Sequence, residues 1–486
     1  MKITNLEKEL NDGRNEFIGE TIQISGNGIF LNENSLLFIN NLSFHDCIFK
    51  GSHLEFEDIN LPDFYLGFFD CRFEISLDIK NCNFKRLGFR DIKSNKSIYI
   101  SEGHYKNFFF RNNSLKEKEV NQLSINLSIC NLTITERIEL DYLNLIDGEF
   151  NFSNNILSNL DSEFKDKIII FENSTFCNAK FLENRFLTPT SFEEMEIIEN
   201  CHFESCEFQR VNFNNLDLGK INFLDCNFLD VFTLHYAQGD LLSSIKFENC
   251  NFDKTVQFNR TASAKFEIDN IQFKNIVSFQ DSYFELIKID RSIFEKKAFF
   301  DDIKIKKIDQ CDRRTIITIK QELQKAENKI DYNRFRVYEF NAYKKDIQKK
   351  LLEFKNDKHR FNHRKREPIQ LKRDLFVLNI SDIISEYGTD WKRAFKFTLL
   401  SGLTAFTLFF ILENLDKSFN LNKWQDFIYG YLRFFLITDF KNEYYDTGES
   451  ILKFNCFLSL IPFILGKIAV AFGIYEMIQS FRKFKA

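Results

Sequence analysis

The stretch that decides the fold runs from residue 201 to residue 231 and reads CHFESCEFQRVNFNNLDLGKINFLDCNFLDV. A large apolar residue recurs at every fifth position: Phe203, Phe208, Phe213, Leu218, Phe223 and Phe228. Two residues before each of these lies a smaller apolar one: Cys201, Cys206, Val211, Leu216, Ile221 and Cys226. A period of five fits neither the 3.6-residue period of a helix nor the two-residue alternation of a strand.

A chain that turns a corner every five residues satisfies this spacing. Both members of each apolar pair then point inward, and the polar residues between units lie at the corners. Stacked square coils can pair their backbones at the ~4.8 Å separation of neighbouring strands. We therefore predict that these twelve side chains form the core of a β-solenoid.

The five-residue units resemble the pentapeptide-repeat proteins, whose chains form right-handed quadrilateral β-helices. The same C/V/I-x-F element recurs less regularly elsewhere, as at Cys47-x-Phe49, Cys71-x-Phe73, Cys250-x-Phe252 and Val277-x-Phe279. We predict one β-helix over residues 1–312, with its coils between about 20 and 310 and an N-terminal cap in 1–20. We expect insertions near 91–145 and 232–244, and the pattern of 121–143 is typical of ordinary alternating strands.

The composition separates three parts of the chain. The 486 residues include 60 Phe, and hydrophobic residues make up 44%, which excludes a disordered or collagen-like chain. Residues 1–312 carry 34 Lys and Arg against 50 Asp and Glu, a net charge of −16. Residues 313–373 carry 19 against 8, a net charge of +11, and residues 374–486 carry 12 against 12. An acidic body, a basic neck and a neutral apolar tail follow one another.

The eleven cysteines include no CxxC pair, and many of them occupy the inward slots of the repeat. A five-residue period places neighbouring units on different faces, so the thiols do not converge on a metal ion. We expect structural packing, no metal and no cofactor. Free thiols, and an N-terminus without an apolar signal stretch, place the β-helix in the cytoplasm in our interpretation.

The neck, residues 313–390, is expected to be helical and basic. Apolar residues recur at helical intervals over 315–355, with a break near 328–331. We predict contact with anionic lipid headgroups by basic residues in and after the dense run at 358–366: Lys358, Arg360, Arg364, Lys365, Arg366, Lys372 and Arg373. A solvated charge run and nucleic-acid contact are the alternatives. His359 and His363 lie four residues apart, but no third metal ligand is evident.

The tail, residues 391–486, contains two apolar stretches, at 394–415 and about 454–478, that are long enough to cross the ~30 Å apolar layer of a membrane. Basic residues precede the first and follow the second, so both ends are expected in the cytoplasm of a bacterium, with the chain crossing its cell membrane twice. Residues 424–440 are too short to cross and indicate a re-entrant or interfacial helix.

Two spans around a short helix are the outline of a pore-loop channel subunit. We name as pore or gating candidates the polar and helix-bending residues of this tail: Thr438, Asp439, Pro462, Gly466, Lys467 and Glu476. Lys467 could line a pore, pair with an acidic group such as Asp439 or lie near the surface, and Pro462 with Gly466 would bend the second span. A TVGYG-like filter is lacking, so potassium selectivity is not supported. An interfacial hairpin that only anchors the chain is the alternative.

The tail also resembles a recurring bacterial arrangement, through residues 326–343, Ile384-Ser-Glu-Tyr-Gly-Thr-Asp-Trp391 and Gly473-Ile-Tyr-Glu-Met-Ile-Gln-Ser-Phe-Arg-Lys-Phe484. The resemblance implies membrane-anchored proteins, mostly of unassigned function, with an ion-channel-like tail.

The first functional hypothesis is a non-enzymatic sensor or docking rod that gates a homo-oligomeric pore, for stress or phage defence. A membrane-tethered scaffold with an unknown protein partner is the second. Mimicry of DNA by the acidic body is the third, although we expect no nucleic-acid partner. Enzyme action is the fourth and is not favoured, because no paired constellation of carboxylates is evident.

Overall fold

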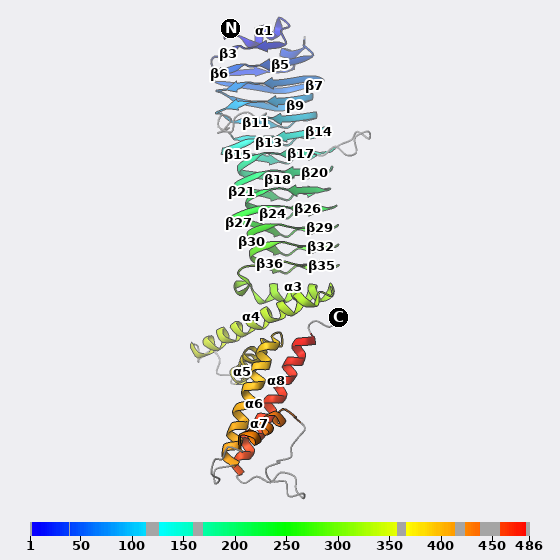
Figure 1. Ribbon diagram of the computed structural model, residues 1–486. Coiled ribbons are helices and arrows are strands. Elements are labelled where there is room, and N and C mark those ends of the chain that lie inside the picture. Colours follow the sequence, from blue (N-terminus) through cyan, green and yellow to red (C-terminus); the bar gives the residue numbers. More distant parts are fainter. Residues whose placement is uncertain are drawn as a thin grey trace. The chain divides into compact units, whose positions relative to one another are not determined.

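Parallel strands, stacked coil upon coil, form the first and longer part of the chain in the computed structural model (Figure 1). The structure describes residues 2–37, 39–112, 126–158, 169–356, 366–413, 423–437 and 457–482. The chain divides into two compact units, Met1–Ala326 and Glu327–Ala486. The first is a β-solenoid of about 13 turns.

The strands of the solenoid's first half are β1 (Lys2–Ile3), β2 (Glu16–Ile18), β3 (Thr21–Ile24), β4 (Ile29–Leu31), β5 (Asn41–His45), β6 (Ile48–Gly51), β7 (His53–Phe69), β8 (Arg72–Phe73), β9 (Ser76–Arg90), β10 (Lys93–Ser94), β11 (Ile98–Ser101), β12 (His104–Arg111), β13 (Leu127–Cys130), β14 (Thr133–Asp141), β15 (Asn144–Ser153), β16 (Ile156–Leu157), β17 (Ile169–Glu172) and β18 (Thr175–Leu182). Those of the second half are β19 (Arg185–Phe186), β20 (Thr190–Glu193), β21 (Glu196–Glu204), β22 (Glu207–Phe208), β23 (Val211–Asn214), β24 (Asp217–Leu224), β25 (Asn227–Phe228), β26 (Phe232–His235), β27 (Gln238–Glu248), β28 (Asn251–Phe252), β29 (Val256–Gln257), β30 (Ala262–Asp269), β31 (Gln272–Phe273), β32 (Val277–Ser278), β33 (Tyr283–Asp290), β34 (Ile293–Phe294), β35 (Ala298–Phe299) and β36 (Lys304–Ile305).

The register between coils explains the five-residue period. Strand β21 pairs in parallel with β24 so that Phe203 lies opposite Phe223, and β22 pairs with β25 so that Phe208 lies opposite Phe228. One coil of this region therefore contains four five-residue units. The twelve side chains predicted to form the core are all buried. The prediction of a solenoid built on this repeat is confirmed.

Phenylalanine rings stack along the solenoid in columns. One column runs through Phe181, Phe203, Phe223 and Phe247, with ring centroids 4.5, 4.8 and 4.6 Å apart and nearly parallel planes. Rings on neighbouring faces of a coil meet edge to face, as Phe203 does with Phe208. Both arrangements suit the charge distribution of an aromatic ring, so the columns fill the core without mutual repulsion.

Residues with the left-handed backbone conformation form many corners of the coils. Ser205, Asn215 and Asp225 have φ values of 53°, 54° and 53°, and an equivalent residue recurs along the solenoid. Most of these corner residues are Asn or Asp, which tolerate this conformation better than other side chains. The corner N–H donates to the next coil, as Ser205 N does to Leu224 O at 2.9 Å. Each such corner is thus both a turn and a link between coils.

Many of the cysteines occupy the position directly after a left-handed corner residue. The Cys226 thiol donates to the carbonyls of Leu224 at 3.3 Å and Phe203 at 3.6 Å. Thr261 uses its hydroxyl in the same way towards Leu234 O, at 2.8 Å. Burial raises the pKa of the Cys82 thiol to about 12, so it stays neutral and can donate. A small side chain that can donate thus fits this position, which aliphatic residues such as Leu216 and Ile271 fill at other corners.

One expectation about irregular regions was wrong, that of ordinary strands over 121–143, and the two expected insertions are found. Strands β13 and β14, within the 121–143 segment, pair in parallel with β11 and β12 of the preceding coil. They are coils of the same solenoid, because their alternating apolar residues fill the same columns. The 91–145 segment nevertheless contains an insertion, because Leu127 lies opposite Ile98 after 29 residues, whereas Phe223 lies opposite Phe203 after 20. The expected insertion near 232–244 is also found: β26 stays in register, and the extra residues lie within 239–243 of β27.

Each end of the solenoid carries a helix. Helix α1 (Leu6–Asn11) buries Leu6 and Leu10 over the first coil, and the four-residue α2 (Glu33–Leu36) contacts β4 and β7. A short 3₁₀ helix, η2 (Ile308–Gln310), precedes α3 (Arg313–Lys325), which packs on β33 and β35. The first compact unit ends at Ala326 and therefore includes α3.

Helix α3 is fixed to the last coil by side chains as well as by packing. Thr315 accepts from the N–H of Ile289 at 2.8 Å and donates to its carbonyl at 3.3 Å. Glu322 is buried. Its carboxylate accepts hydrogen bonds from the backbone N–H of Ala298 at 3.3 Å and from the Lys325 ammonium at 2.6 Å. These contacts satisfy backbone groups that the final coil would otherwise leave without a strand partner.

The second unit is helical. It contains α4 (Lys329–Asn356), α5 (Arg366–Ser385), α6 (Trp391–Glu413), α7 (Lys423–Phe434), the 3₁₀ helix η4 (Phe457–Ser459) and α8 (Leu460–Arg482). The predicted break in the neck is found, because α3 ends at Lys325 and α4 begins at Lys329. Helices α6 and α8 form a tightly packed pair, against which α5 and α7 also pack.

Candidate functional site in the helical unit

Helices α6 and α8 approach each other closely because small residues line their contact. A side chain added at Gly466 would collide with Ala405, and one added at Gly473 would collide with Thr398. Gly466 therefore serves close packing, as small residues do between helices in membranes. Pro462 lies in the first turn of α8, where its missing N–H removes no helical hydrogen bond, and α8 continues unbroken to Arg482.

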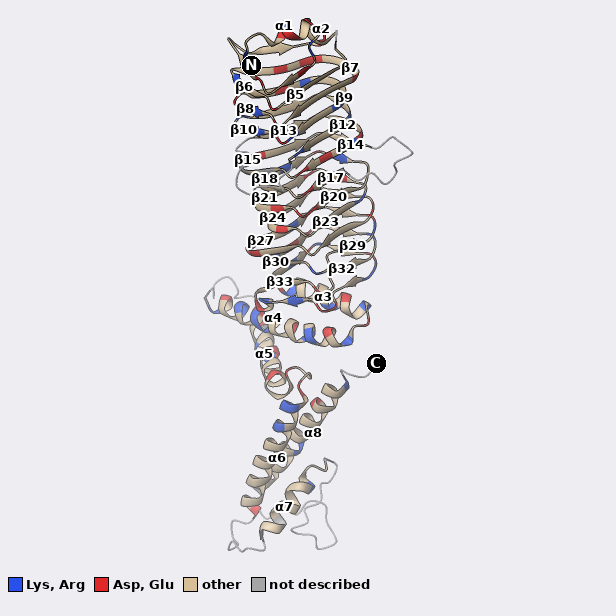
Figure 2. Ribbon diagram, turned by 45° about the horizontal axis from the view of Figure 1, so that its top comes forward, with Lys and Arg blue, Asp and Glu red and all other residues tan. Residues whose placement is uncertain are grey.

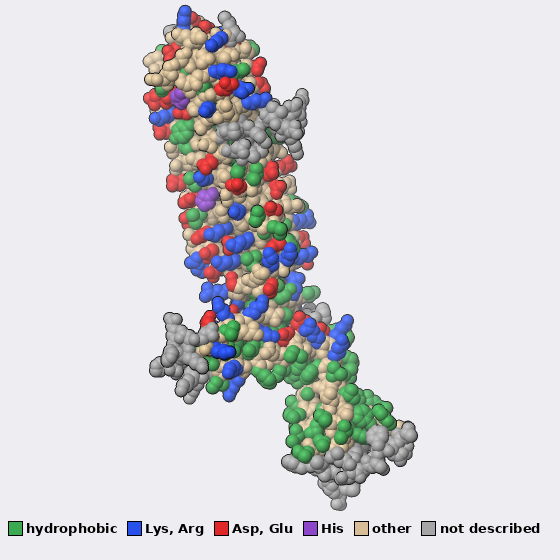
Figure 3. All heavy atoms as spheres, turned by 90° about the vertical axis from the view of Figure 1, so that its left-hand side faces the viewer, with side chains coloured by type: hydrophobic (Ala, Val, Ile, Leu, Met, Phe, Trp, Pro, Cys, Tyr) green, Lys and Arg blue, Asp and Glu red, His purple; other side chains and the backbone are tan. Residues whose placement is uncertain are grey.

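The pair carries its apolar side chains outward. Helices α6 and α8 are each 23 residues long and apolar enough to cross a membrane, and only 28% and 33% of their most apolar windows are buried. A core helix of a soluble protein would bury more. The charged residues of α6 gather at its two ends (Figure 2), and hydrophobic side chains cover much of the visible surface of this region (Figure 3). Both helices could therefore cross a membrane.

Helix α7 runs back along α6 to the middle of that helix. Its Phe427 ring lies 5.3 Å from the rings of both Phe406 and Phe410. One turn later, the Tyr431 hydroxyl donates to Leu399 O at 3.0 Å. From Phe410 to Leu399 is about 17 Å along a helix, roughly half the apolar thickness of a membrane. Helix α7 thus covers about half the length of the pair and ends beside its centre.

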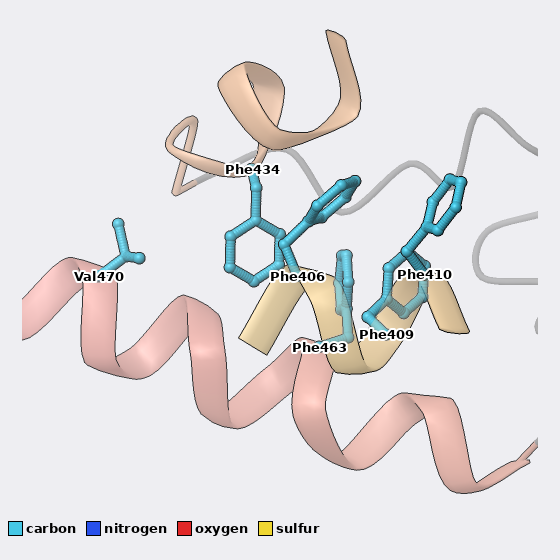
Figure 4. Close-up of a cluster of buried hydrophobic side chains, with 6 residues drawn as sticks. All are labelled: Phe406, Phe409, Phe410, Phe434, Phe463 and Val470. Atoms are coloured by element: carbon cyan, nitrogen blue, oxygen red, sulfur yellow. The ribbon is translucent and has the colours of Figure 1, made fainter. Parts of the chain in front are cut away.

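Aromatic side chains fix α7 in this position. The buried cluster, drawn in Figure 4, consists of Phe406, Phe409, Phe410, Phe434, Phe463 and Val470. Phe434 contributes from α7, while the others come from α6 and α8. Its ring lies 5.6 Å from Phe406 and 5.8 Å from Phe463, so one α7 side chain bridges both long helices.

Lys467 lies beneath the end of α7. It is 4% exposed, and its ammonium donates to Phe434 O at 2.9 Å and Leu436 O at 2.7 Å. It also lies 4.9 Å from the centre of the Phe434 ring. The last carbonyls of a helix carry partial negative charge, so the ammonium binds them with charge-assisted hydrogen bonds. Lys467 is therefore not at the surface, and it holds the end of α7 from within the chain.

Glu476 forms a second buried polar contact, nine residues further along α8. Its carboxylate accepts from the Ser385 hydroxyl at 2.5 Å, and Ser385 Oγ accepts from Gly388 N at 2.7 Å. Both Glu476 and Ser385 are buried. The contact ties the end of α5 to α8 across the turn that leads into α6. We call Ser385, Gly388 and Glu476 the polar joint.

The turn at the polar joint has an unusual backbone. Glu386, Tyr387 and Gly388 are three successive residues in the left-handed region, with φ values of 50°, 59° and 76°. Neighbours hold this conformation: Arg336 of α4 donates to Tyr387 O at 3.0 Å, and the Tyr387 hydroxyl donates to Asn341 at 3.1 Å. A side chain at Gly388 would also crowd Gln479 of α8. The joint therefore links α4, α5 and α8.

The remaining candidates are placed as follows. Thr438, Asp439, Lys358, Arg360, Arg364 and Lys365 lie outside the described residues. Arg366 is the first residue of α5, and Lys372 and Arg373 are exposed on that helix. Lys467 and Glu476 bind different partners at different levels of α8.

The partners of these groups are not evident in the sequence. Ser385 lies inside the quoted Ile384–Trp391 motif, but nothing in the motif indicates that it meets α8. Glu413 at the end of α6 is also buried and binds the Ser459 hydroxyl. The acid that ends an otherwise uncharged stretch was a signal for this contact. A comparison with known proteins found no matching family, no matching curated protein and no matching solved structure.

Proposed function

We propose that this chain is a non-enzymatic protein of a bacterial cell membrane, in which a cytoplasmic β-solenoid senses or docks a protein partner and controls a homo-oligomeric pore. Stress or phage defence is the setting that we propose. The observation that carries the proposal is the path of α7, which runs halfway along the α6–α8 pair and ends on a buried lysine.

A helix that ends at mid-depth is costly in a membrane unless its last carbonyls find partners. Membrane transport proteins use such half-helix ends, and the ionisable residues beside them, along ion pathways. Lys467 and the α7 carbonyls have this arrangement. We therefore propose that the surface around the α7 end faces the axis of an oligomer.

The polar joint supports control from the neck. Helix α4 reaches it through Arg336 and Asn341, and α8 reaches it through Glu476. A movement of α4 would change contacts that fix α8, since the three left-handed residues between them have little freedom. Partner binding on the solenoid would act on α8 by this route.

A membrane-tethered scaffold without a pore is the second candidate. It is favoured by the Lys467 contacts, because a single chain already supplies partners to the α7 carbonyls and closes the aromatic cluster. No further copy is required for those groups.

Ion flux from the full chain in liposomes distinguishes the two. We expect conductance that changes severalfold in Lys467→Met and stays within twofold in Lys396→Met, which removes an exposed charge of α6. Oligomeric protein without conductance would eliminate the pore. A stable monomer in mild detergent would support the scaffold.

A further inference from the structure

Helix α5 presents an apolar face to its surroundings. Ile369, Phe376, Val377 and Ile383 are 53%, 65%, 63% and 73% exposed. At 100° per residue these four positions fall on one side of the helix. Scattered apolar residues are ordinary on a protein surface, but a continuous stripe of this kind marks an interaction surface.

The same face carries basic residues and no described acidic one. Lys372 and Arg373 are exposed among the four apolar residues. The acids of α5, Glu367, Asp374 and Asp382, lie about half a turn away, and none of them is exposed. Asp382 is bound by Lys344 of α4 at 3.0 Å. The face is therefore both apolar and cationic, which excludes a basic partner.

Two cavities meet at Lys372. One, of about 690 Å³, lies between α4 and α5, with an apolar wall that includes Leu351, Leu352 and Pro368 and with Lys355 and Lys372 at its edge. The other is an open hollow of about 430 Å³ on the surface of α5, lined by Ile369, Lys372, Arg373, Phe376 and Val377. Each offers apolar surface beside an ammonium or guanidinium group. A molecule with a phosphate and long apolar chains has this combination of properties.

We infer that α5 lies in the headgroup layer of an anionic bilayer, with its apolar stripe towards the acyl chains and with lipid phosphates held at Lys372 and Arg373. Amphipathic helices bind membranes in this way. The turn 386–390 leads directly from α5 into α6, and α5 packs against both α6 and α8, so the stripe is continuous with helices that could cross a membrane. That continuity favours lipid over a soluble partner or a second copy. The inference rests on the membrane placement of α6 and α8, but not on the pore.

The test uses the full chain in nanodiscs, in a background where Trp391→Phe and Trp424→Phe remove the native tryptophans. Phe376→Trp places a probe on the stripe, Lys349→Trp places one on an exposed position of α4, and Leu400→Trp places one on the exposed face of α6. We expect brominated phospholipids to quench the probes at 376 and 400, and the probe at 349 to be quenched by aqueous iodide instead.

The proposed contact of lipid phosphates with Lys372 and Arg373 is tested by adding Lys372→Gln and Arg373→Gln to the Phe376→Trp variant. Each basic residue near an anionic surface contributes about 1 kcal/mol, or roughly a fivefold preference. We expect the preference for anionic over zwitterionic lipid, read from quenching at 376 in mixed nanodiscs, to fall about 25-fold. The control, Lys349→Gln with Lys350→Gln, removes two exposed charges of α4 and should leave the preference within twofold.

Quenching at 400 without quenching at 376 would overturn the inference and leave the membrane placement standing. If the probe at 376 were then shielded from iodide, protein covers the stripe, and a second copy is its occupant. If neither probe were quenched by lipid, the membrane placement itself would fail. If lipid quenched the probe at 376 but Lys372→Gln and Arg373→Gln did not reduce the preference for anionic lipid, the role of Lys372 and Arg373 would be overturned.

Discussion

The aromatic columns predict a steep dependence of local stability on single rings, and Phe223 is the most informative position. Its side chain is 2% exposed and stacks between Phe203 at 4.8 Å and Phe247 at 4.6 Å. Rings on the adjoining faces, such as Phe228 at 5.9 Å, meet it edge to face. Truncating a buried Phe to Ala costs about 3–5 kcal/mol.

A conservative substitution separates stacking from burial. Phe223→Leu keeps most of the apolar volume but loses two stacked contacts worth about 0.5–1.5 kcal/mol each, so we expect a cost of about 1–3 kcal/mol. Asn222→Ala, on the adjacent outward-facing residue, should change stability by less than about 0.5 kcal/mol.

Hydrogen exchange of the full chain, read by mass spectrometry, measures these costs locally. In a solenoid each coil contacts only its neighbours, so the effect should be confined to them. For Phe223→Ala we expect exchange to accelerate by roughly 150- to 5,000-fold in peptides covering 196–252. Peptides covering 16–45 should be unchanged. Acceleration below tenfold, or an equal effect in both sets of peptides, would refute the column as the local source of stability.

Three further predictions follow from other contacts. Asn215 lies in the left-handed region, so Asn215→Gly should be nearly neutral or stabilising while Asn215→Val should cost about 2 kcal/mol or more, measured by urea unfolding in mild detergent. The pKa of Cys82 is raised to about 12, so as the pH rises its thiol ionises in the unfolded chain before it ionises in the folded one. Its contribution to the free energy of unfolding is therefore complete below about pH 8.5 and declines by about 1.4 kcal/mol per pH unit from there to pH 12. Cys82→Ala should remove this decline from the measured pH dependence of unfolding. Glu476→Leu removes the acceptor of the Ser385 hydroxyl and should lower the free energy of thermal unfolding by about 1–3 kcal/mol. Glu476→Gln keeps an acceptor and should cost less. Equal costs for the two variants would contradict the hydrogen bond as the source of the stability.

The core positions of the solenoid could be predicted from the sequence because they repeat at a short, fixed spacing along the chain. Each coil repeats the same geometry, so the positions of Phe203 and Phe208 follow from a count of residues. The corner positions follow from the same count, but the left-handed backbone at particular corners does not, since residues such as Tyr142 and Arg260 adopt it as well as Asn and Asp. Coils whose apolar residues depart from five-residue spacing, as over 121–143, were misread because strand alternation fits them equally well.

The candidate site was predictable only in part. The ionisable residues Lys467 and Glu476 stand out in an apolar segment, and both are buried. Their partners lie on other helices, at Phe434 and Ser385, and such pairings depend on packing rather than on sequence spacing. Pro462 lies in the first turn of α8, where a proline leaves the helical hydrogen bonds intact, and this place could not be predicted without the start of the helix.

The contacts of α3 with the last coil also bear on how the protein behaves in a crowded cell. An exposed strand edge is a template on which another chain can add, and stacked coils would extend such an edge into a fibre. Thr315 occupies both backbone groups of Ile289, and Glu322 occupies Ala298 N, so an incoming strand finds these positions already taken. Two side chains of one helix thus oppose end-to-end polymerisation at this edge of the solenoid.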